Sequence, residues 1–305
     1  MIKSVAITGA NSMIGIHIIW NLLSQGVRVL AITRTVSKEL KEIPEGDNFK
    51  ILQCNMLDYA ILDKSISEKY DAFIHLAWMG TSGTGRDDTK TQKLNKSYAL
   101  DCVTLANKIG CKTFLGVGSQ AEFGRVDGVI KYNTLSCPTT PYGMAKYLTC
   151  LRTRELSHEL GMKHVWVRIF SVYGPCNVKN SVVMQSVDSF LKGKSLEYTS
   201  GTQIWNFLYA KDAAEGILLA LEKGKDGSVY CIANNENKQL KEYIYQIRDI
   251  INPSVSLKFG GRKDDNVISL NVDISREMEE LGFMPKVSFE EGIKETIKWY
   301  KENMK

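Results

Sequence analysis

Short runs of apolar residues recur along the first half of the chain, and amphipathic stretches separate them. Runs that are apolar at nearly every position are typical of parallel strands buried on both faces of a sheet. Between these runs, helical periodicity begins at Met13 and is clear over 95–109. Strands alternating with helices predict an α/β fold with a doubly wound parallel sheet and right-handed crossovers. The expected strands cover residues 4–8, 26–33, 50–54, 71–77, 113–117 and 164–170.

The first strand leads into a glycine turn and then into a helix. This order of elements is the context in which a glycine motif binds a dinucleotide. Gly9 allows the tight turn, Gly15 lets the helix pack closely on the strand, and the free N–H groups of the helix start face the pyrophosphate. Ser12 stands where a glycine usually lets the backbone approach the phosphates. The expected cofactor contacts in this segment are Gly9, Asn11, Ser12, Met13, Ile14 and Gly15.

The second strand ends at Arg34, where a dinucleotide-binding fold meets the adenosine ribose. An acidic residue there would bind the 2′-hydroxyl of NAD, whereas an arginine accommodates the 2′-phosphate of NADP. Arg34, followed by hydroxyl groups at Thr35 and Ser37, therefore favours NADP. A solvated arginine at a strand end is the alternative interpretation, and NAD stays the alternative cofactor.

After residue 170 the alternation becomes less regular. The pattern predicts helices over 182–192 and 213–222, the second capped by Asp212, and strands over 203–209 and 227–233. From residue 238 onwards, we expect helices around a small strand. Residues 1–170 are therefore expected to form a dinucleotide-binding Rossmann domain, to which elements near 205–234 return. Residues 171–305 are expected to form mainly a smaller α/β substrate-binding domain.

The composition excludes several classes of protein. The chain has 305 residues, 44% of them hydrophobic, and a net charge of +5 with basic and acidic residues interspersed, so no nucleic-acid partner is expected. No apolar run approaches the roughly 20 residues that span a bilayer, and no secretory signal precedes the first strand. The 7 cysteines are spread singly, which suits a reducing cytoplasm and no metal site. A cytoplasmic location is expected.

Two further segments carry candidate catalytic residues. Ser119 follows the fifth strand, at the carboxyl edge where such sheets bind ligands. Tyr142 and Lys146 stand one turn apart on a helix that Thr140 can cap and Pro141 can begin. An ammonium group near the phenol favours phenolate and would lower the tyrosine pKa from about 10. Tyr142 would then exchange a proton near neutral pH, with Ser119 hydrogen-bonded to the same substrate oxygen. The alternative interpretation is that Tyr142 and Lys146 are an ordinary surface pair.

Together these motifs resemble the extended short-chain dehydrogenase/reductases, in particular their nucleotide-sugar epimerase, dehydratase and reductase branch. The resemblance covers nearly the whole chain. It rests on Thr8-Gly9 with Gly15, 71–77, Asn95, Ser119 with Phe123-Gly124, Tyr142 with Lys146, 168–175, 205–209, Asp212, Asp273 and 281–285.

The resemblance implies that Ser119, Tyr142 and Lys146 are a catalytic triad. Tyr142 would exchange a proton with a sugar oxygen while the nicotinamide exchanges hydride with the carbon that bears it, and Lys146 would also hold the nicotinamide ribose. Further cofactor contacts are implied at Asn55, Met56, Leu76, Ala77, Trp78, Asn95 and Val172. Substrate contacts are implied at Ser119, Gln120, Ser181, Val182 and Arg262, the last with the nucleotide diphosphate.

One departure from the family pattern narrows the reaction. Dehydratases of this branch carry an Asp-Glu pair directly after the serine or threonine, and here those positions are Gln120 and Ala121, which cannot supply the general acid and base. A 4,6-dehydratase is therefore not expected. The leading hypothesis is an NADPH-dependent reductase of a nucleotide-linked 4-keto-6-deoxyhexose, because NADPH suits a net reduction.

Two alternatives stay open. A nucleotide-hexose 4-epimerase similar to UDP-glucose 4-epimerase would keep NAD tightly bound and use the same catalytic residues. A non-catalytic dinucleotide-sensing protein is the minor alternative, because fold alone does not determine function. By resemblance, a homodimer is expected through the helices that begin near Asn95 and Tyr142.

Overall fold

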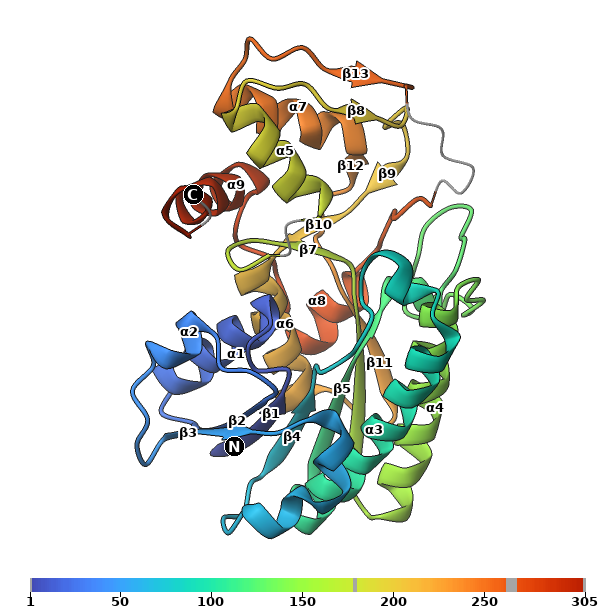
Figure 1. The fold of residues 1–305 in the computed structure, drawn as a ribbon. Helices are drawn as coiled ribbons and strands as arrows, with labels where there is room; N and C mark the ends of the chain where they lie inside the picture. Colours follow the sequence, from blue (N-terminus) through green and yellow to red (C-terminus); the bar gives the residue numbers. More distant parts are fainter. Residues whose placement is uncertain (1, 178–179, 262–267, 304–305) are drawn as a thin grey trace.

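The central sheet of the computed structural model is parallel throughout (Figure 1). Among residues 2–177, 180–261 and 268–303, which the structure describes, it has seven strands in the order β11-β6-β5-β4-β1-β2-β3. The order reverses between β1 and β4, as in a doubly wound fold, so the predicted Rossmann-type fold is confirmed. The strands are β1 (Ser4–Thr8), β2 (Arg28–Thr33), β3 (Phe49–Gln53), β4 (Ala72–His75), β5 (Thr113–Ser119), β6 (Lys163–Ile169) and β11 (Ser228–Ile232).

Helices cover both faces of this sheet (Figure 1). Side chains of successive strand residues point to opposite faces, so Val5 and Ile7 join one apolar cluster and Ala6 joins another. The first cluster lies under α1 (Met13–Ser24), α6 (Ala210–Lys223) and α8 (Ser275–Leu281). The second lies under α3 (Thr89–Lys108), α4 (Pro141–Glu159) and the 3-10 helix η1 (Met56–Ser65). The short α2 (Lys38–Lys41) follows β2.

A third apolar cluster lies beyond the carboxyl ends of the strands, at the top of Figure 1. Its centre is aromatic: Phe289 packs against Tyr173, Phe207 and Tyr243, with ring centroids 4.6 to 5.6 Å apart. The division into two domains stays a prediction. The elements of this part are β7 (Ser171–Tyr173), α5 (Val182–Leu191), β8 (Glu197–Tyr198), β9 (Ile204–Trp205), β10 (Phe207–Tyr209), β12 (Lys238–Gln239), α7 (Leu240–Ile251), β13 (Lys258–Phe259) and α9 (Phe289–Asn303).

Three local predictions differ from the structure. The helix expected from residue 95 begins at Thr89, because Asp88 caps it by accepting from the N–H groups of Lys90 and Thr91. The strand expected over 203–209 is divided, since β9 pairs with β12 and β10 pairs with β7.

The prediction that Asp212 caps a helix is wrong. α6 begins two residues earlier, and the Asp212 carboxylate accepts from the N–H groups of Lys286 (3.1 Å) and Val287 (2.9 Å). Asp212 therefore fixes the segment before α9 onto the start of α6. A tertiary contact has taken up the carboxylate that a local pattern had assigned to a cap.

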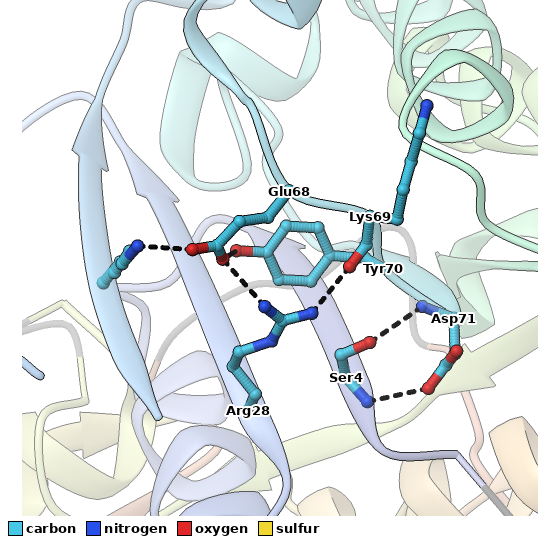
Figure 2. Close-up of polar contacts among 7 residues, drawn as sticks. Ser4, Arg28, Glu68, Lys69, Tyr70 and Asp71 are labelled. Atoms are coloured by element: carbon cyan, nitrogen blue, oxygen red, sulfur yellow. Dashed lines mark hydrogen bonds and ion pairs between the residues drawn. The ribbon is translucent and has the colours of Figure 1, made fainter. Parts of the chain in front are cut away.

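A polar network closes the amino ends of the central strands (Figure 2). Arg28 of β2 pairs with Glu68 at 3.0 Å, and the Tyr70 hydroxyl donates to the same carboxylate. One step along, the Asp71 carboxylate accepts from the Ser4 N–H group, and the Asp71 N–H group donates to the Ser4 hydroxyl. The network therefore fixes the segment before β4 against β1 and β2. It lies at the edge of the sheet opposite to the predicted site.

Two glycines in β5 make room for a large buried side chain. A Cβ atom at Gly116 would lie 2.2 Å from the Trp166 ring, and one at Gly118 would lie 2.1 Å from Glu122 Oε1. The fully buried Trp166 side chain therefore lies across β5 at two positions where only glycine leaves enough room. Its indole N–H donates to the Glu122 carboxylate, which also pairs with Arg168.

This packing predicts a large loss of stability for Gly118→Ala. The added methyl group must displace the indole or the carboxylate, both buried, so the free energy of unfolding should fall by about 2 kcal/mol or more in urea denaturation. Gly46→Ala is the control, because no heavy atom within 4 Å would meet its Cβ atom. Equal stability of the two variants would contradict the crowding at β5.

In the part of the chain that the structure describes, no helix is both long and apolar enough to cross a membrane.

Candidate active site and dinucleotide cleft

A cleft of about 590 Å³ follows the carboxyl ends of β1, β2 and β4. Its volume is within the range of roughly 300–1,000 Å³ that is typical of small-molecule sites. Among the residues predicted to contact a cofactor, those that line it are Gly9, Asn11, Ser12, Arg34, Asn55, Met56, Leu76, Ala77 and Trp78. Thr35, whose hydroxyl was expected beside Arg34, lines it too, and sequence reasoning missed Thr33, Tyr59, Met79, Gly80, Thr81, Gly85 and Thr91 as lining residues.

The glycine turn has the two close approaches that its sequence predicts. Gly9 has a φ of +70°, and a Cβ atom there would lie 2.8 Å from the Ala77 backbone nitrogen. A Cβ atom at Gly15 would lie 2.5 Å from the carbonyl oxygen of Gly9. Ser12 is the N-cap of α1, and its hydroxyl accepts from the Gly15 N–H group at 3.1 Å. The serine at the irregular position thus stabilises the start of the helix.

The cleft wall is poor in charge. Arg34 is exposed and lines the cleft, and no acidic residue does so in the described part of the chain. Beside it, the Thr35 hydroxyl accepts from the Asn11 amide at 3.2 Å. The Ser37 hydroxyl is instead the N-cap of α2 and does not line the cleft. An anionic ligand would therefore meet a guanidinium group and hydroxyl groups at this end.

The structure brings Ser119, Tyr142 and Lys146 together. Ser119 is the last residue of β5, and α4 begins with Thr140 as its N-cap and Pro141 in its first turn, as predicted. The Ser119 side chain lies near enough to the Tyr142 hydroxyl to lower its pKa. All three candidate residues are buried, with at most 7% of each exposed.

The prediction that Lys146 lowers the pKa of Tyr142 is wrong. Burial raises the pKa of Tyr142, and this effect outweighs the hydrogen bond from Ser119 and the nearby Arg86 guanidinium, which both lower it. Lys146 Nζ donates to the Val117 carbonyl oxygen at 2.6 Å and lies 3.7 Å from the centre of the Trp78 ring. Burial lowers the pKa of Lys146 to about 7. The ammonium group is therefore aimed at a carbonyl and an indole.

Glu122 is a residue of the site that sequence reasoning missed. Its fully buried carboxylate accepts from the Ser119 N–H group at 2.8 Å and from Arg168 Nε at 2.8 Å. The spacing of Ser119 and Glu122 is that of a capping box, which was the available signal. Glu122 therefore holds the backbone of Ser119, and its negative charge raises the pKa values of both Tyr142 and Lys146.

Asn95 acts on the loop after β4. Its amide oxygen accepts from the Met79 N–H group at 2.9 Å, and its amide nitrogen donates to the Met79 carbonyl at 2.8 Å. The neighbouring Gln92 donates to the carbonyls of Gly80 and Gly85 and accepts from the Trp78 indole N–H group. Both amides are buried behind the loop. Asn95 is therefore not among the lining residues, and it positions those that are.

The other predicted residues are dispersed. Ser181 is the N-cap of α5, and Val182 packs against the third apolar cluster. Val172 lies in β7, and Met13 and Ile14 lie in the first turn of α1; none of the three lines the cleft. Arg262 lies outside the described residues. Gln120 follows Ser119, and its buried amide oxygen has no hydrogen-bond partner among the described residues.

The fold and the grouping of Ser119, Tyr142 and Lys146 place the chain in the class of extended short-chain dehydrogenase/reductase enzymes. More narrowly, it belongs to the NAD dependent epimerase/dehydratase family, whose model matches residues 5–233.

Individual relatives are distant but similar over their whole length. A dTDP-D-glucose 4,6-dehydratase from Bos taurus is 26% identical over 99% of this chain and 89% of its own length. The structure of a UDP-glucose 4-epimerase with UDP-glucose from Thermotoga maritima matches with a TM-score of 0.88 and 23% identity, covering 99% of this chain and 100% of that one. A UDP-glucuronic acid 4-epimerase from Bacillus cereus in complex with NAD matches with a TM-score of 0.86 and 22% identity, covering 99% and 100%. These two likenesses show the fold.

The buried position of Lys146 predicts a pH dependence of stability. Its pKa is 10.5 ordinarily and about 7 in the fold, so between these values the unfolded chain binds the additional proton. The free energy of unfolding that Lys146 contributes must therefore rise as the pH increases through this window, and it must be level below about pH 7. The difference between the wild type and Lys146→Met, measured by urea denaturation at about pH 6 and about pH 9, should increase with pH.

Lys90→Met controls for the loss of one positive charge, because Lys90 is exposed. A wild-type minus Lys146→Met difference that stays level between these two pH values would show that the lysine is held as an ammonium ion.

Proposed function

We propose that the chain is an oxidoreductase that reduces the keto group of a nucleotide-linked 4-keto-6-deoxyhexose, with a nicotinamide dinucleotide in the cleft and Tyr142 as the acid. The observation that carries this proposal is the contact of Tyr142 with Ser119 at the carboxyl edge of the sheet, beside the cleft. Membership of an NAD-dependent enzyme family supports the cofactor class.

The residues of the cleft fit a dinucleotide. Side chains are excluded at Gly9 and Gly15, so the turn packs tightly against the sheet and α1 begins at the cleft, where the N–H groups of a helix start suit a pyrophosphate. Arg34 with Thr35 suits the adenosine ribose and a 2′-phosphate, because an arginine binds phosphate through two parallel hydrogen bonds. We therefore propose NADP as the cofactor. NAD is the alternative, and a related 4-epimerase structure contains it.

The chemistry follows from where the side chains point. When bound, the nicotinamide supplies the hydride. Ser119, which lies beside Tyr142, polarises the ketone oxygen by hydrogen bonding. Tyr142 donates its phenolic proton to that oxygen as negative charge develops there. The raised pKa of Tyr142 keeps the phenol protonated at neutral pH, which suits an acid. Lys146 lies one turn away and holds the ribose.

The substrate proposal rests on Gln120. A buried polar atom without a partner is uncommon and is often explained by a ligand. The Gln120 amide oxygen is such an atom, next to Ser119, and it suits a hydroxyl donor of a sugar ring. Gln120 and Ala121 stand where the dehydratases carry an Asp-Glu pair. Because neither side chain can act as general acid or base, the proposed reaction adds hydride and eliminates no water.

A 4-epimerase is the second candidate. The likeness to two 4-epimerase structures along the whole chain favours it. The same Tyr142 would then first remove the proton of a 4-hydroxyl group and later return it. Arg34 in place of an acidic residue is the observation that weighs against a tightly held NAD.

The assembly and location also stay proposals. Leu94 on α3 and Met144 and Leu148 on α4 are large apolar side chains, each at least 40% exposed. We propose that these two helices pair in a homodimer, which would cover the three side chains. A cytoplasmic location stays a prediction.

One assay separates the two candidate reactions. The nucleotide released from the denatured protein is identified, and NADPH absorbance is then followed with a nucleotide-linked 4-keto-6-deoxyhexose. Consumption of NADPH is expected, and Tyr142→Phe should reduce the rate roughly 100-fold or more while cofactor binding persists. Tyr147→Phe on the same helix is the control. Bound NAD, no NADPH consumption and interconversion of 4-epimeric sugars would replace the reductase with the epimerase.

Cofactor preference can be tested at Arg34. The Arg34→Asp change removes the phosphate partner and adds a ribose partner, so the ratio of NADP to NAD affinity should fall about tenfold or more in equilibrium titrations. Lys41→Asp makes the same change of charge on α2, outside the cleft lining, and should leave the ratio unchanged. A ratio that does not respond at Arg34 would remove the argument for NADP.

A further inference from the structure

An arginine from the loop after β4 lies on the ring of Tyr142. Arg86 is the last residue of the 3-10 helix η2 (Gly83–Arg86), and its guanidinium carbon is 4.3 Å from the centre of the Tyr142 ring. Its side chain is half-buried and has no hydrogen bond or ion pair among the residues that the structure describes. A cation over an aromatic face is attracted by the ring, and more strongly when the ring carries a negative charge.

Lys146, one turn from Tyr142, contacts groups other than the phenol. Lys146 donates to the Val117 carbonyl and lies over Trp78, and burial lowers its pKa to about 7. A lysine in this state is only partly charged at neutral pH. An arginine side chain keeps its positive charge throughout this range. Among the residues that the structure describes, Arg86 is the arginine whose guanidinium lies over the Tyr142 ring.

The other charged groups around Tyr142 act against phenolate or are paired. Glu122, from the 3-10 helix η3 (Gln120–Glu122), raises the Tyr142 pKa and is itself paired with Arg168 of β6. His75 of β4 faces Lys146, and burial lowers its pKa to about 3, so it is neutral. On α3 the neighbouring buried side chains are the amides Gln92 and Asn95, which carry no charge.

The buried Gln92 side chain fixes the loop that carries Arg86. Gln92 donates to the Gly80 carbonyl at 3.0 Å and to the Gly85 carbonyl at 2.8 Å, directly before Arg86. Gly80 and Gly85 approach so closely that a Cβ atom at Gly85 would lie 2.8 Å from the Gly80 Cα atom. The two glycines and one buried amide therefore form a closed loop. This arrangement sets the position of Arg86 before any ligand binds.

We propose that Arg86 is a positioning residue of the site, whose guanidinium stabilises the negative charge of Tyr142 as the phenol gives up its proton. The proposal rests on the proposed role of Tyr142 in proton transfer. Arg86 makes the buried phenol a stronger acid in the direction of reduction. In the direction of oxidation it makes the phenolate easier to form.

A titration without substrate tests this directly. The protein is labelled with 3-fluorotyrosine, and the fluorine signal that disappears in Tyr142→Phe is assigned to Tyr142 and followed against pH. In Arg86→Gln the midpoint should move to higher pH, because an opposite charge in contact typically changes proton affinity tenfold or more. Arg86→Lys should restore part of the shift. Lys90→Gln, which removes an exposed charge from the first turn of α3, should leave the midpoint in place.

The same variants carry a kinetic prediction. With an active substrate, Arg86→Gln should lower kcat about tenfold or more and move the limb of the pH profile assigned to Tyr142 to higher pH, with Arg86→Lys between it and the wild type. Coincident titrations of the wild type and Arg86→Gln would overturn the proposal, and so would a raised KM with an unmoved pH limb. Because the titration needs no substrate, a missing reductase activity would contradict the proposed function and leave this result standing.

Discussion

The carboxylate of Glu122 is the contact on which the site depends. Glu122 is fully buried, and its carboxylate accepts hydrogen bonds from the Ser119 N–H group at the end of β5 and from Trp166 and Arg168 of β6. A buried charge of this kind is tolerated only when its partners are complete, and removal of one partner costs about 3–5 kcal/mol. The glycines of β5 leave space that the Trp166 ring and the Glu122 carboxylate occupy. Ser119 owes its fixed backbone to this cluster.

The loop after β4 depends on two buried amides in the same way. Gln92 and Asn95 pair with the backbone and indole groups of the loop, so the glycine-rich segment has a defined shape. The loop then does two things at once. It closes one wall of the cleft with Trp78, and it presents Arg86 to Tyr142.

Burial sets the electrostatics of the site. Tyr142 and Lys146 are both removed from water, and desolvation moves the pKa of each toward its neutral form. Nearby charges shift these pKa values further. Glu122 raises the pKa of both groups, and Arg86 lowers the pKa of Tyr142. The sequence spacing of Tyr142 and Lys146 predicted a lysine that activates a tyrosine. Burial of the phenol instead raises the pKa of Tyr142, and it outweighs the groups that lower this pKa.

The fold class and the outline of the cleft could be predicted from the sequence alone, because they depend on local order. Apolar runs alternating with helical periodicity determine a doubly wound sheet, and Gly9 and Gly15 mark a turn that must pack closely. Tyr142 and Lys146 share a helix, so their spacing shows that they are neighbours. The contact of Arg86 with Tyr142, the pairing of Glu122 with Arg168 and the partners of Asp212 could not be predicted, because each joins residues from different elements. The tertiary structure alone decided which charges face one another and how deeply they are buried, and those two quantities set the pKa values of Tyr142 and Lys146.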